Sequence, residues 1–307
     1  LIDFLKKRNL KLEEIAKQRL IRVPNGEPSS LRQIDWDKED IPATKHLFYS
    51  GKKRFFPIIY TRGCPYSCFE YCTYPIAQGR KTFQEDIETF VGKLKDFSKQ
   101  YQGAHLVFRD PVFSINLKKS KMLLRAIGNA KLNLTFSAEL HLKNIDDEFI
   151  KLCNYSKVTW LKFGIESAFD EIRDSINRYS VSNDIQKKTI EKLKKANIKV
   201  HGMFILAQPT DTLETCKKTI DYACELNLNV AQFSIFTPYP GTPYYRKNLS
   251  KLDFQNYEDF TQFHLVYKHL SISKTVARKI LQMAYLKFLY TKVKKNILFF
   301  HQRKQSY

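Results

Sequence analysis

The sequence contains little glycine and proline, which account for only 10 and 11 of its 307 residues. These low numbers exclude a collagen-like or low-complexity chain, and a hydrophobic share of 43% argues against disorder. No apolar run is long enough to span a bilayer, and no signal peptide opens the chain. We therefore expect a cytoplasmic globular protein. Because the chain opens on Leu1 rather than Met, we also expect it to be a piece of a longer protein.

Acidic residues are scarce beside basic ones, with 31 Asp and Glu against 52 Lys and Arg, which gives a formal net charge of +21. Such an excess attracts phosphates, anionic lipid headgroups or an acidic partner. The lysines are scattered rather than concentrated in one domain, however. A general bias toward Lys, Ile, Asn, Phe and Tyr explains them without a dedicated nucleic-acid surface, so we expect no nucleic-acid partner.

Apolar runs and helix patterns alternate from about residue 55 onward. Buried strands are predicted at 56–60, 105–108, 134–137, 159–163, 199–206 and 230–236. Helices are predicted between them, at about 83–101, 118–130, 146–155, 183–196 and 212–226. This alternation predicts βα units and a parallel sheet with right-handed crossovers. We therefore expect an α/β fold, a partial (β/α)6 TIM-like barrel with its site at the C-terminal ends of the strands.

Two further segments flank this barrel, which we place at residues 51–248. Residues 1–50 contain turn signals near Pro24 and Pro28 and predict a helix followed by a linker. Residues 249–307 predict a basic helical C-terminal extension. The extension either packs its apolar side on the barrel as a cover, which we favour, or lies on a membrane surface as a basic amphipathic helix.

The six cysteines divide into a dispersed group and a dense one. The dispersed ones are Cys153, Cys216 and Cys224. They lie in helix-like segments and are predicted to be small buried side chains. Cys64, Cys68 and Cys72 lie within nine residues, in a loop after the first strand. Structural zinc requires four ligands, and no second pair of close cysteines or histidines is present. Three thiolates with one open position suit an iron–sulfur cubane with one iron free to bind a ligand.

The loop Arg62-Gly63-Cys64-Pro65-Tyr66-Ser67-Cys68 and the aromatic–Cys pair after it resemble the cluster loop of radical S-adenosylmethionine (SAM) enzymes. The resemblance covers roughly residues 20–300 and is closest to the class whose barrel follows a cobalamin-binding domain. It implies that Cys64, Cys68 and Cys72 hold a [4Fe-4S] cluster whose fourth iron binds SAM, and that reductive cleavage of SAM yields a 5′-deoxyadenosyl radical. The family usually has two residues between its last two cysteines, whereas this chain has three.

The same resemblance implies that residues near the strand ends bind SAM. They are Tyr71, Asp110, Glu139, Glu166, Arg178 and Tyr239. Tyr71 is the aromatic residue expected beside the adenine. Glu166, in a Gly-x-Glu-Ser motif, is expected to accept hydrogen bonds from the ribose or the ammonium group. Arg178 stands where the family usually has Lys, and its fork geometry suits the SAM carboxylate.

Two of these residues have a structural alternative of about equal weight. Asp110 is either a ligand or a helix-capping or turn residue. Glu139 is either a ligand or the ion-pair partner of a neighbouring Lys or Arg, because a carboxylate buried in a barrel needs a partner. Tyr239 belongs to a segment that closely matches the family's ending, Thr237-Pro238-Tyr239-Pro240-Gly241-Thr242-Pro243-Tyr244.

The resemblance implies a radical SAM enzyme that acts on a carbon centre, with methyl transfer the commonest outcome of the cobalamin-dependent class. Cobalamin itself would require a domain that is not visible in this chain. The implied partners are SAM, a small-molecule or lipid-like substrate, and an electron donor such as flavodoxin or ferredoxin. Two alternatives stay open. One is a tRNA-modifying, methylthiotransferase-like enzyme, motivated by the charge of +21. The other is a non-catalytic barrel protein, motivated by the irregular cysteine spacing.

Overall fold

The computed structural model of the protein describes residues 49–304, apart from residues 51, 52, 67 and 144. The described residues belong to one compact unit of the chain, Pro42–Tyr307. The helix and linker predicted within residues 1–50 lie almost entirely outside the described residues.

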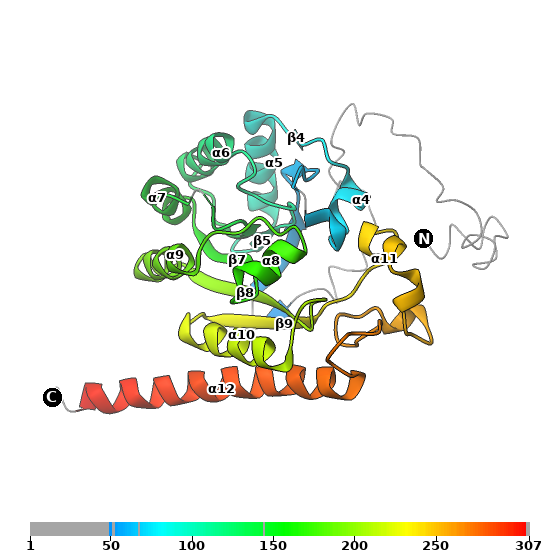
Figure 1. The fold of residues 1–307 in the computed structure, drawn as a ribbon. Coiled ribbons are helices and arrows are strands. Elements are labelled where there is room, and N and C mark those ends of the chain that lie inside the picture. Colours follow the sequence, from blue (N-terminus) through cyan, green and yellow to red (C-terminus); the bar gives the residue numbers. More distant parts are fainter. Residues whose placement is uncertain (1–48, 51–52, 67, 144, 305–307) are drawn as a thin grey trace. The chain divides into compact units, whose positions relative to one another are not determined.

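Parallel strands form the sheet at the centre of the fold. In chain order they are β2 (Lys53–Ile58), β5 (His105–Phe108), β6 (Thr135–Leu140), β7 (Val158–Glu166), β8 (Lys199–Leu206) and β9 (Val230–Ile235). Each pairs in parallel with the next, and the short strand β1 (Tyr49–Ser50) adds antiparallel to β2. The sheet curls into a half-barrel with helices on its outer side (Figure 1). The expected partial (β/α)6 barrel is confirmed.

The helices between successive parallel strands are α5 (Ile87–Gln100), α6 (Leu117–Asn129), α7 (Asp147–Tyr155), α9 (Asn183–Lys195) and α10 (Leu213–Glu225). Each is preceded by a residue whose side chain accepts a hydrogen bond from a backbone N–H of the first turn. These caps are Asp86, Asn116, Asp146, Ser182 and Thr212. Capping satisfies donors that the first turn leaves without an intrahelical partner. The cap residues therefore explain why each helix starts where it does.

Short elements occupy the loops that follow the strands. They are β3 (Thr61–Arg62), η1 (Cys68–Glu70), α4 (Tyr74–Gln78), β4 (Phe83–Gln84), α8 (Asp170–Ser175), α11 (Pro243–Lys247), η2 (Leu249–Lys251) and η3 (Tyr257–Asp259). Strands β3 and β4 pair antiparallel and enclose the cysteine loop. The sequence did not predict these elements, because they are too short to show a hydrophobic period.

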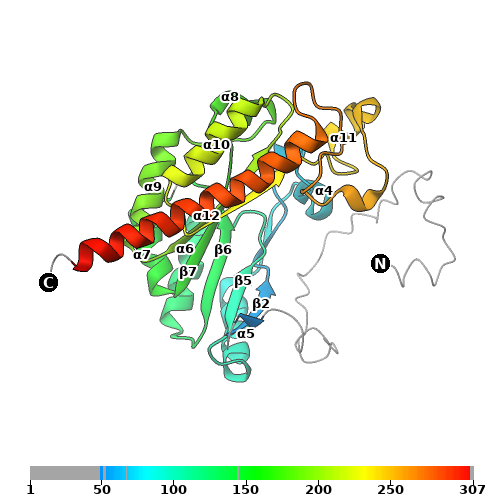
Figure 2. The same ribbon diagram turned by 90° about the horizontal axis from the view of Figure 1, so that it is seen from below.

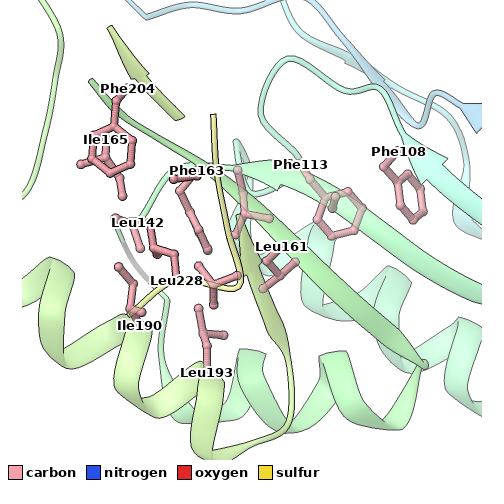
Figure 3. Packing of buried hydrophobic residues seen from close by; sticks show 14 of the residues in the cluster. Phe108, Phe113, Leu142, Leu161, Phe163, Ile165, Ile190, Leu193, Phe204 and Leu228 are labelled. Carbon is pink, nitrogen blue, oxygen red and sulfur yellow. The ribbon is translucent and has the colours of Figure 1, made fainter. Parts of the chain in front are cut away.

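The core lies between the convex face of the sheet and the helices. On β7, Leu161 and Phe163 point toward Ile190 and Leu193 of α9 (Figure 3), and all four side chains are at most 1% exposed. Successive side chains of a strand point to opposite faces, so Lys162 lies on the concave face. The half-barrel therefore buries its apolar face and keeps its concave face for polar groups.

Helix α12 (Lys274–Lys304) runs past the last strand of the sheet, beside α10 (Figure 2). Its inner side packs on the core through Ala277, Ile280 and Ala284, each at most 2% exposed. The Tyr285 hydroxyl lies 3.1 Å from the backbone nitrogen of Phe233 and 2.8 Å from its carbonyl oxygen, so it bonds to both. The helical extension thus covers the edge of the barrel, as expected. Every helix in the described part of the chain is too short or too polar to serve as a transmembrane span.

Candidate active site

A cavity of about 370 Å³ lies on the concave side of the half-barrel, bordered by the loops at the C-terminal ends of the strands. Cys64, Cys68 and Cys72 all line it. The other expected site residues that line it are Tyr71, Glu139, Glu166, Arg178 and Tyr239. The fold therefore brings together residues from positions 64 to 239, leaving only Asp110 of the expected set outside the lining.

The cysteine loop holds two of its thiols together by a helical turn. The Cys72 N–H donates to the Cys68 carbonyl oxygen at 3.2 Å. Residues four apart in a helical turn lie on the same side, and the two thiols hydrogen bond to each other. The Cys64 N–H is bonded to the Gly79 carbonyl oxygen at 3.0 Å. The three-residue spacing that departs from the family pattern is accommodated by this turn.

The electrostatics of the loop favour a thiolate at Cys68. The hydrogen bond with Cys72 lowers the pKa of Cys68, burial opposes it, and the Arg178 guanidinium lowers it further. Arg178 Nη1 lies 3.9 Å from the Cys68 sulfur. Within the part of the chain that is described, no three His, Cys, Asp or Glu side chains surround one point as ligands of a single metal ion do. The three thiols line one cavity, and cysteine thiolates are the ligands by which proteins hold iron–sulfur clusters.

Gly63 sets the backbone that leads into Cys64. Its φ of +83° lies in the left-handed region, and a Cβ at this position would collide with the carbonyl oxygen of Lys81. Gly79, in the same loop, also has a φ of +83°, but a Cβ there would meet nothing within 4 Å. An alanine at position 79 would therefore meet backbone strain alone, whereas an alanine at position 63 would also meet a steric collision.

We expect Gly63→Ala to lower the iron bound after anaerobic reconstitution severalfold, because the loop must shift to relieve the collision. Gly79→Ala carries only a backbone cost, roughly 1–3 kcal/mol for a positive φ with an extended ψ, and should retain most of its iron. Iron per chain is the measurement, and circular dichroism checks that both variants keep the barrel. Equal iron in the two variants would contradict the role given to Gly63.

Asp110 supports the loop instead of lining the cavity. Its two carboxylate oxygens accept hydrogen bonds from the backbone N–H groups of Tyr60 at 2.9 Å and Thr61 at 2.7 Å. Burial raises the pKa of Asp110 to about 7, while these N–H groups act to lower it. The carboxyl group thus ties the end of β5 to the turn between β2 and β3. These are the contacts of a turn-holding residue, and the expected contact of Asp110 with a ligand stays a prediction.

Glu166 and Arg178 form a buried pair at the end of β7. Arg178 Nε lies 3.4 Å from Glu166 Oε1, and Nη2 donates to the Gly164 carbonyl oxygen at 3.0 Å. The Tyr71 hydroxyl lies 3.4 Å from the same carboxylate oxygen. A Cβ on Gly164 would lie 2.5 Å from Glu166 and 2.7 Å from Arg178. Glycine at 164 therefore makes room for the pair.

Two features of this pair indicate a ligand site. Glu166 has a φ of +67°, beside a shift in the β7–β8 register, and left-handed backbone at a non-glycine residue concentrates at functional sites. Arg178 Nε is buried, and its contact with Glu166 Oε1 at 3.4 Å lies outside hydrogen-bond geometry. A guanidinium beside the cysteine loop suits a carboxylate ligand. The residues present therefore fit a SAM molecule beside an iron–sulfur cluster.

The sequence interpretation missed polar residues deeper in the cavity. Arg109 and Lys162 also line it, although neither was named as a site residue. Burial raises the pKa of Glu139, while Arg109 and Lys162 oppose this. Glu139 forms no ion pair with a described residue, so the pairing considered from sequence is not found there. Side chains two apart in a strand point to the same face. Lys162 is two residues before Gly164 of the Gly-x-Glu-Ser motif, so this spacing could have indicated that Lys162 shares the face of the site.

The radical SAM superfamily model matches residues 58–223, which is more than half of the chain. The chain belongs to the radical SAM superfamily. Membership implies a [4Fe-4S] cluster and SAM as cofactors, as expected from the cysteine loop.

Several curated relatives are named as methyltransferases. An uncharacterized methyltransferase of Pyrococcus horikoshii is 26% identical over 236 residues, 76% of this chain and 51% of that protein. The bacteriochlorophyllide d C-12(1)-methyltransferase of Chlorobaculum tepidum is 24% identical over 218 residues, 70% of this chain and 47% of that protein. The chain spans about half the length of these relatives.

Solved structures share the fold. The radical SAM methyltransferase TsrM from Kitasatospora setae, with tryptophan substrate and a SAM analog bound, has a TM-score of 0.57 and 20% identity. The match covers 62% of this chain and 38% of that one. Coproporphyrinogen III oxidase from Escherichia coli has a TM-score of 0.54 and 13% identity, covering 78% and 53% of the two chains.

Proposed function

We propose that this chain is the catalytic half-barrel of a radical SAM methyltransferase that acts on a carbon centre. The observation that carries the proposal is the shared cavity of the three cysteines and the Glu166–Arg178 pair at the C-terminal ends of the strands. When bound, the cluster supplies the electron that cleaves SAM. Cys64, Cys68 and Cys72 would hold three of its irons, leaving the fourth for SAM.

The roles that we assign to the other side chains follow from their chemistry. Arg178 binds and orients the SAM carboxylate with its guanidinium fork. Glu166 accepts hydrogen bonds from the ribose hydroxyls or the ammonium group of SAM. Tyr71 holds the Glu166 carboxylate in place through its hydroxyl group. Tyr239 lies on the cavity wall formed by the segment after β9 and limits access of water to the site.

Methyl transfer is the reaction that the relatives support, since two curated relatives are named as methyltransferases. TsrM binds cobalamin and a [4Fe-4S] cluster, and this chain covers 36% of that protein. We propose that cobalamin, where the reaction uses it, is bound by a region corresponding to the remainder of such relatives. The tRNA-modifying alternative is not favoured, because the relatives described above are named as methyltransferases.

The test is anaerobic reconstitution with iron and sulfide, followed by incubation with SAM and dithionite. We expect a brown protein that forms 5′-deoxyadenosine, the product of reductive SAM cleavage. Methyl donation leaves S-adenosylhomocysteine instead, so chromatography of both nucleosides distinguishes the two reactions. A protein that retains its three cysteines, stays colourless and forms neither product would overturn the proposal.

Reductive cleavage of SAM consumes an electron, so we propose that an electron-transfer protein such as flavodoxin or ferredoxin reduces the cluster. We also propose a cytoplasmic location. In its support, all six cysteines are free thiols, which suits a reducing compartment. The substrate that we propose is a small molecule or lipid-like compound that fits the cavity.

We further propose that the outer side of α12 rests on an anionic membrane surface. Leu286, Leu289, Tyr290 and Val293 are 48–68% exposed, and their spacing places them on one side of the helix. The helix contains many Lys and Arg residues and no Asp or Glu. Apolar side chains flanked by basic ones are the pattern of interfacial helices on anionic lipids.

Cosedimentation with vesicles of phosphatidylserine and phosphatidylcholine tests this surface. We expect salt-sensitive binding that Leu289→Glu weakens severalfold, because a carboxylate on this side repels anionic lipid and removes an apolar contact. Leu270→Glu is the matched control, since Leu270 is 94% exposed but precedes the helix. Equal binding of the two variants would count against a membrane contact through α12.

A further inference from the structure

A row of polar side chains crosses the concave face of the half-barrel below the cysteine loop. The strand register places Glu139 of β6 opposite Lys162 of β7, and Lys162 opposite His201 of β8. Arg109 directly follows Phe108, whose partner Ala138 directly precedes Glu139, so Arg109 extends the row at its other end. Adjacent strands lie about 4.8 Å apart. These four residues, here called the basic row, are therefore neighbours in space.

The basic row lies one step deeper in the cavity than the Glu166–Arg178 pair. Lys162 precedes Gly164 by two residues, which is about 6.6 Å along a strand, and the Gly164 carbonyl oxygen is the one that Arg178 bonds to. Arg109, Glu139 and Lys162 line the same cavity as the cysteines. A molecule that lies beside SAM in this cavity can therefore reach the row.

The basic row carries more positive than negative charge. Arg109 and Lys162 face the single carboxyl group of Glu139, and no ion pair within 4 Å joins any of the three to another described residue. Burial lowers the pKa of Lys162, and the Glu139 carboxylate opposes that effect. The excess is therefore a single positive charge that no described residue neutralises.

His201 adds an unsatisfied polar atom beside Lys162. Its Nε2 is buried and has no hydrogen-bond partner among the described residues. Buried polar atoms in folded proteins are nearly always bonded. His201 is not among the residues that line the cavity, so the donors that an acceptor in the cavity can reach are those of Lys162 and Arg109.

We propose that Lys162, flanked by Arg109 and His201, binds a carboxylate group of the substrate inside the half-barrel. This inference rests on the proposed function, because it places the substrate next to SAM. One excess positive charge matches a carboxylate rather than a dianionic phosphate, and the Lys and Arg donors form charge-assisted hydrogen bonds with it. SAM also carries a carboxylate, so the experiment must separate the two sources.

The probe is 4-fluorobenzoate, and 4-fluorobenzamide is the uncharged control of the same shape. Fluorine-19 NMR measures the binding of each compound to the anaerobically reconstituted chain in the presence of saturating SAM. We expect saturable binding of the benzoate and none of the amide. Lys162→Met should weaken benzoate binding about tenfold or more, since one charge-assisted hydrogen bond is lost. Lys162→Arg should restore most of it. Lys151→Met, at an exposed lysine of α7, should bind like the unaltered chain.

Iron content and circular dichroism establish that each variant folds and holds its cluster. Equal benzoate binding by the unaltered chain and Lys162→Met overturns the inference, and so does an equal loss in Lys151→Met. A fall in SAM affinity by the same factor as the probe assigns the subsite to the SAM carboxylate and also overturns it. Lys162-dependent probe binding without formation of either 5′-deoxyadenosine or S-adenosylhomocysteine upholds the subsite but refutes the proposed function. The reverse result refutes the subsite alone.

Discussion

Each of the single variants Cys64→Ala, Cys68→Ala and Cys72→Ala should lose 5′-deoxyadenosine formation. In each, the bound iron should fall from about four atoms per chain to a trace. The three thiols line one cavity, and a cluster that keeps an iron open for SAM has no spare protein ligand to lose. Cys68 and Cys72 are held together by one helical turn, so loss of either removes half of a joined pair. Iron and acid-labile sulfide analysis, with the visible absorption band, gives the measurement.

Cys153→Ala is the matched control for these variants. Cys153 is 0% exposed and lies in the apolar core. Burial raises the pKa of its thiol, so the side chain stays protonated and acts as a small apolar group. It should lose a little thermal stability and keep its iron and activity. Retention of the cluster by any one of the three loop variants would show that its cysteine is not a ligand.

Arg178→Met should have the second-largest effect, on SAM affinity and on stability together. Losing the guanidinium removes the donors assigned to the SAM carboxylate, which at about 1.5–3 kcal/mol per charged hydrogen bond corresponds to a roughly 10- to 150-fold loss of affinity. It also leaves Glu166 buried without its cation, which costs about 3–5 kcal/mol. Equilibrium dialysis with SAM and urea denaturation measure the two effects.

The stability cost should depend on pH in a stated direction. Burial raises the pKa of Glu166 above its ordinary 4.5, and Arg178 and Tyr71 oppose that rise. Without Arg178 the pKa rises further, so the folded state binds more protons than the unfolded state does. Stability of the variant is then fully present below pH 4.5 and falls as pH rises through the folded pKa. Urea denaturation of Arg178→Met should show a larger deficit at pH 8 than at pH 5.

The double variant Glu166→Gln with Arg178→Met separates the two roles of Arg178. Removing the carboxylate charge should recover much of the lost stability, because no buried anion is left unpaired. SAM affinity should stay low, since the donors are still missing. Recovery of SAM affinity in the double variant would mean that Arg178 acts only by pairing with Glu166.

The cysteine loop and the order of the barrel strands follow from the sequence itself. Their signals are local: three cysteines within nine residues, and apolar runs separated by capped helices. Each expected strand is found in order, because a buried parallel strand requires a continuous apolar run whatever its neighbours are. Residues 51–248 could therefore be interpreted as a barrel before any coordinate was known.

Tertiary contacts alone decided what individual polar side chains do. Asp110 lies in a family-like motif, but its oxygens are used by the backbone N–H groups of Tyr60 and Thr61, residues about 50 positions earlier. Strand alternation puts Lys162 on the same face as Gly164, but only the curl of the sheet makes that face the concave one that lines the cavity. The cysteine loop can be identified from adjacent residues of the sequence. The hydrogen-bond partners of Asp110 and the position of Lys162 depend instead on which strands lie next to each other in the fold.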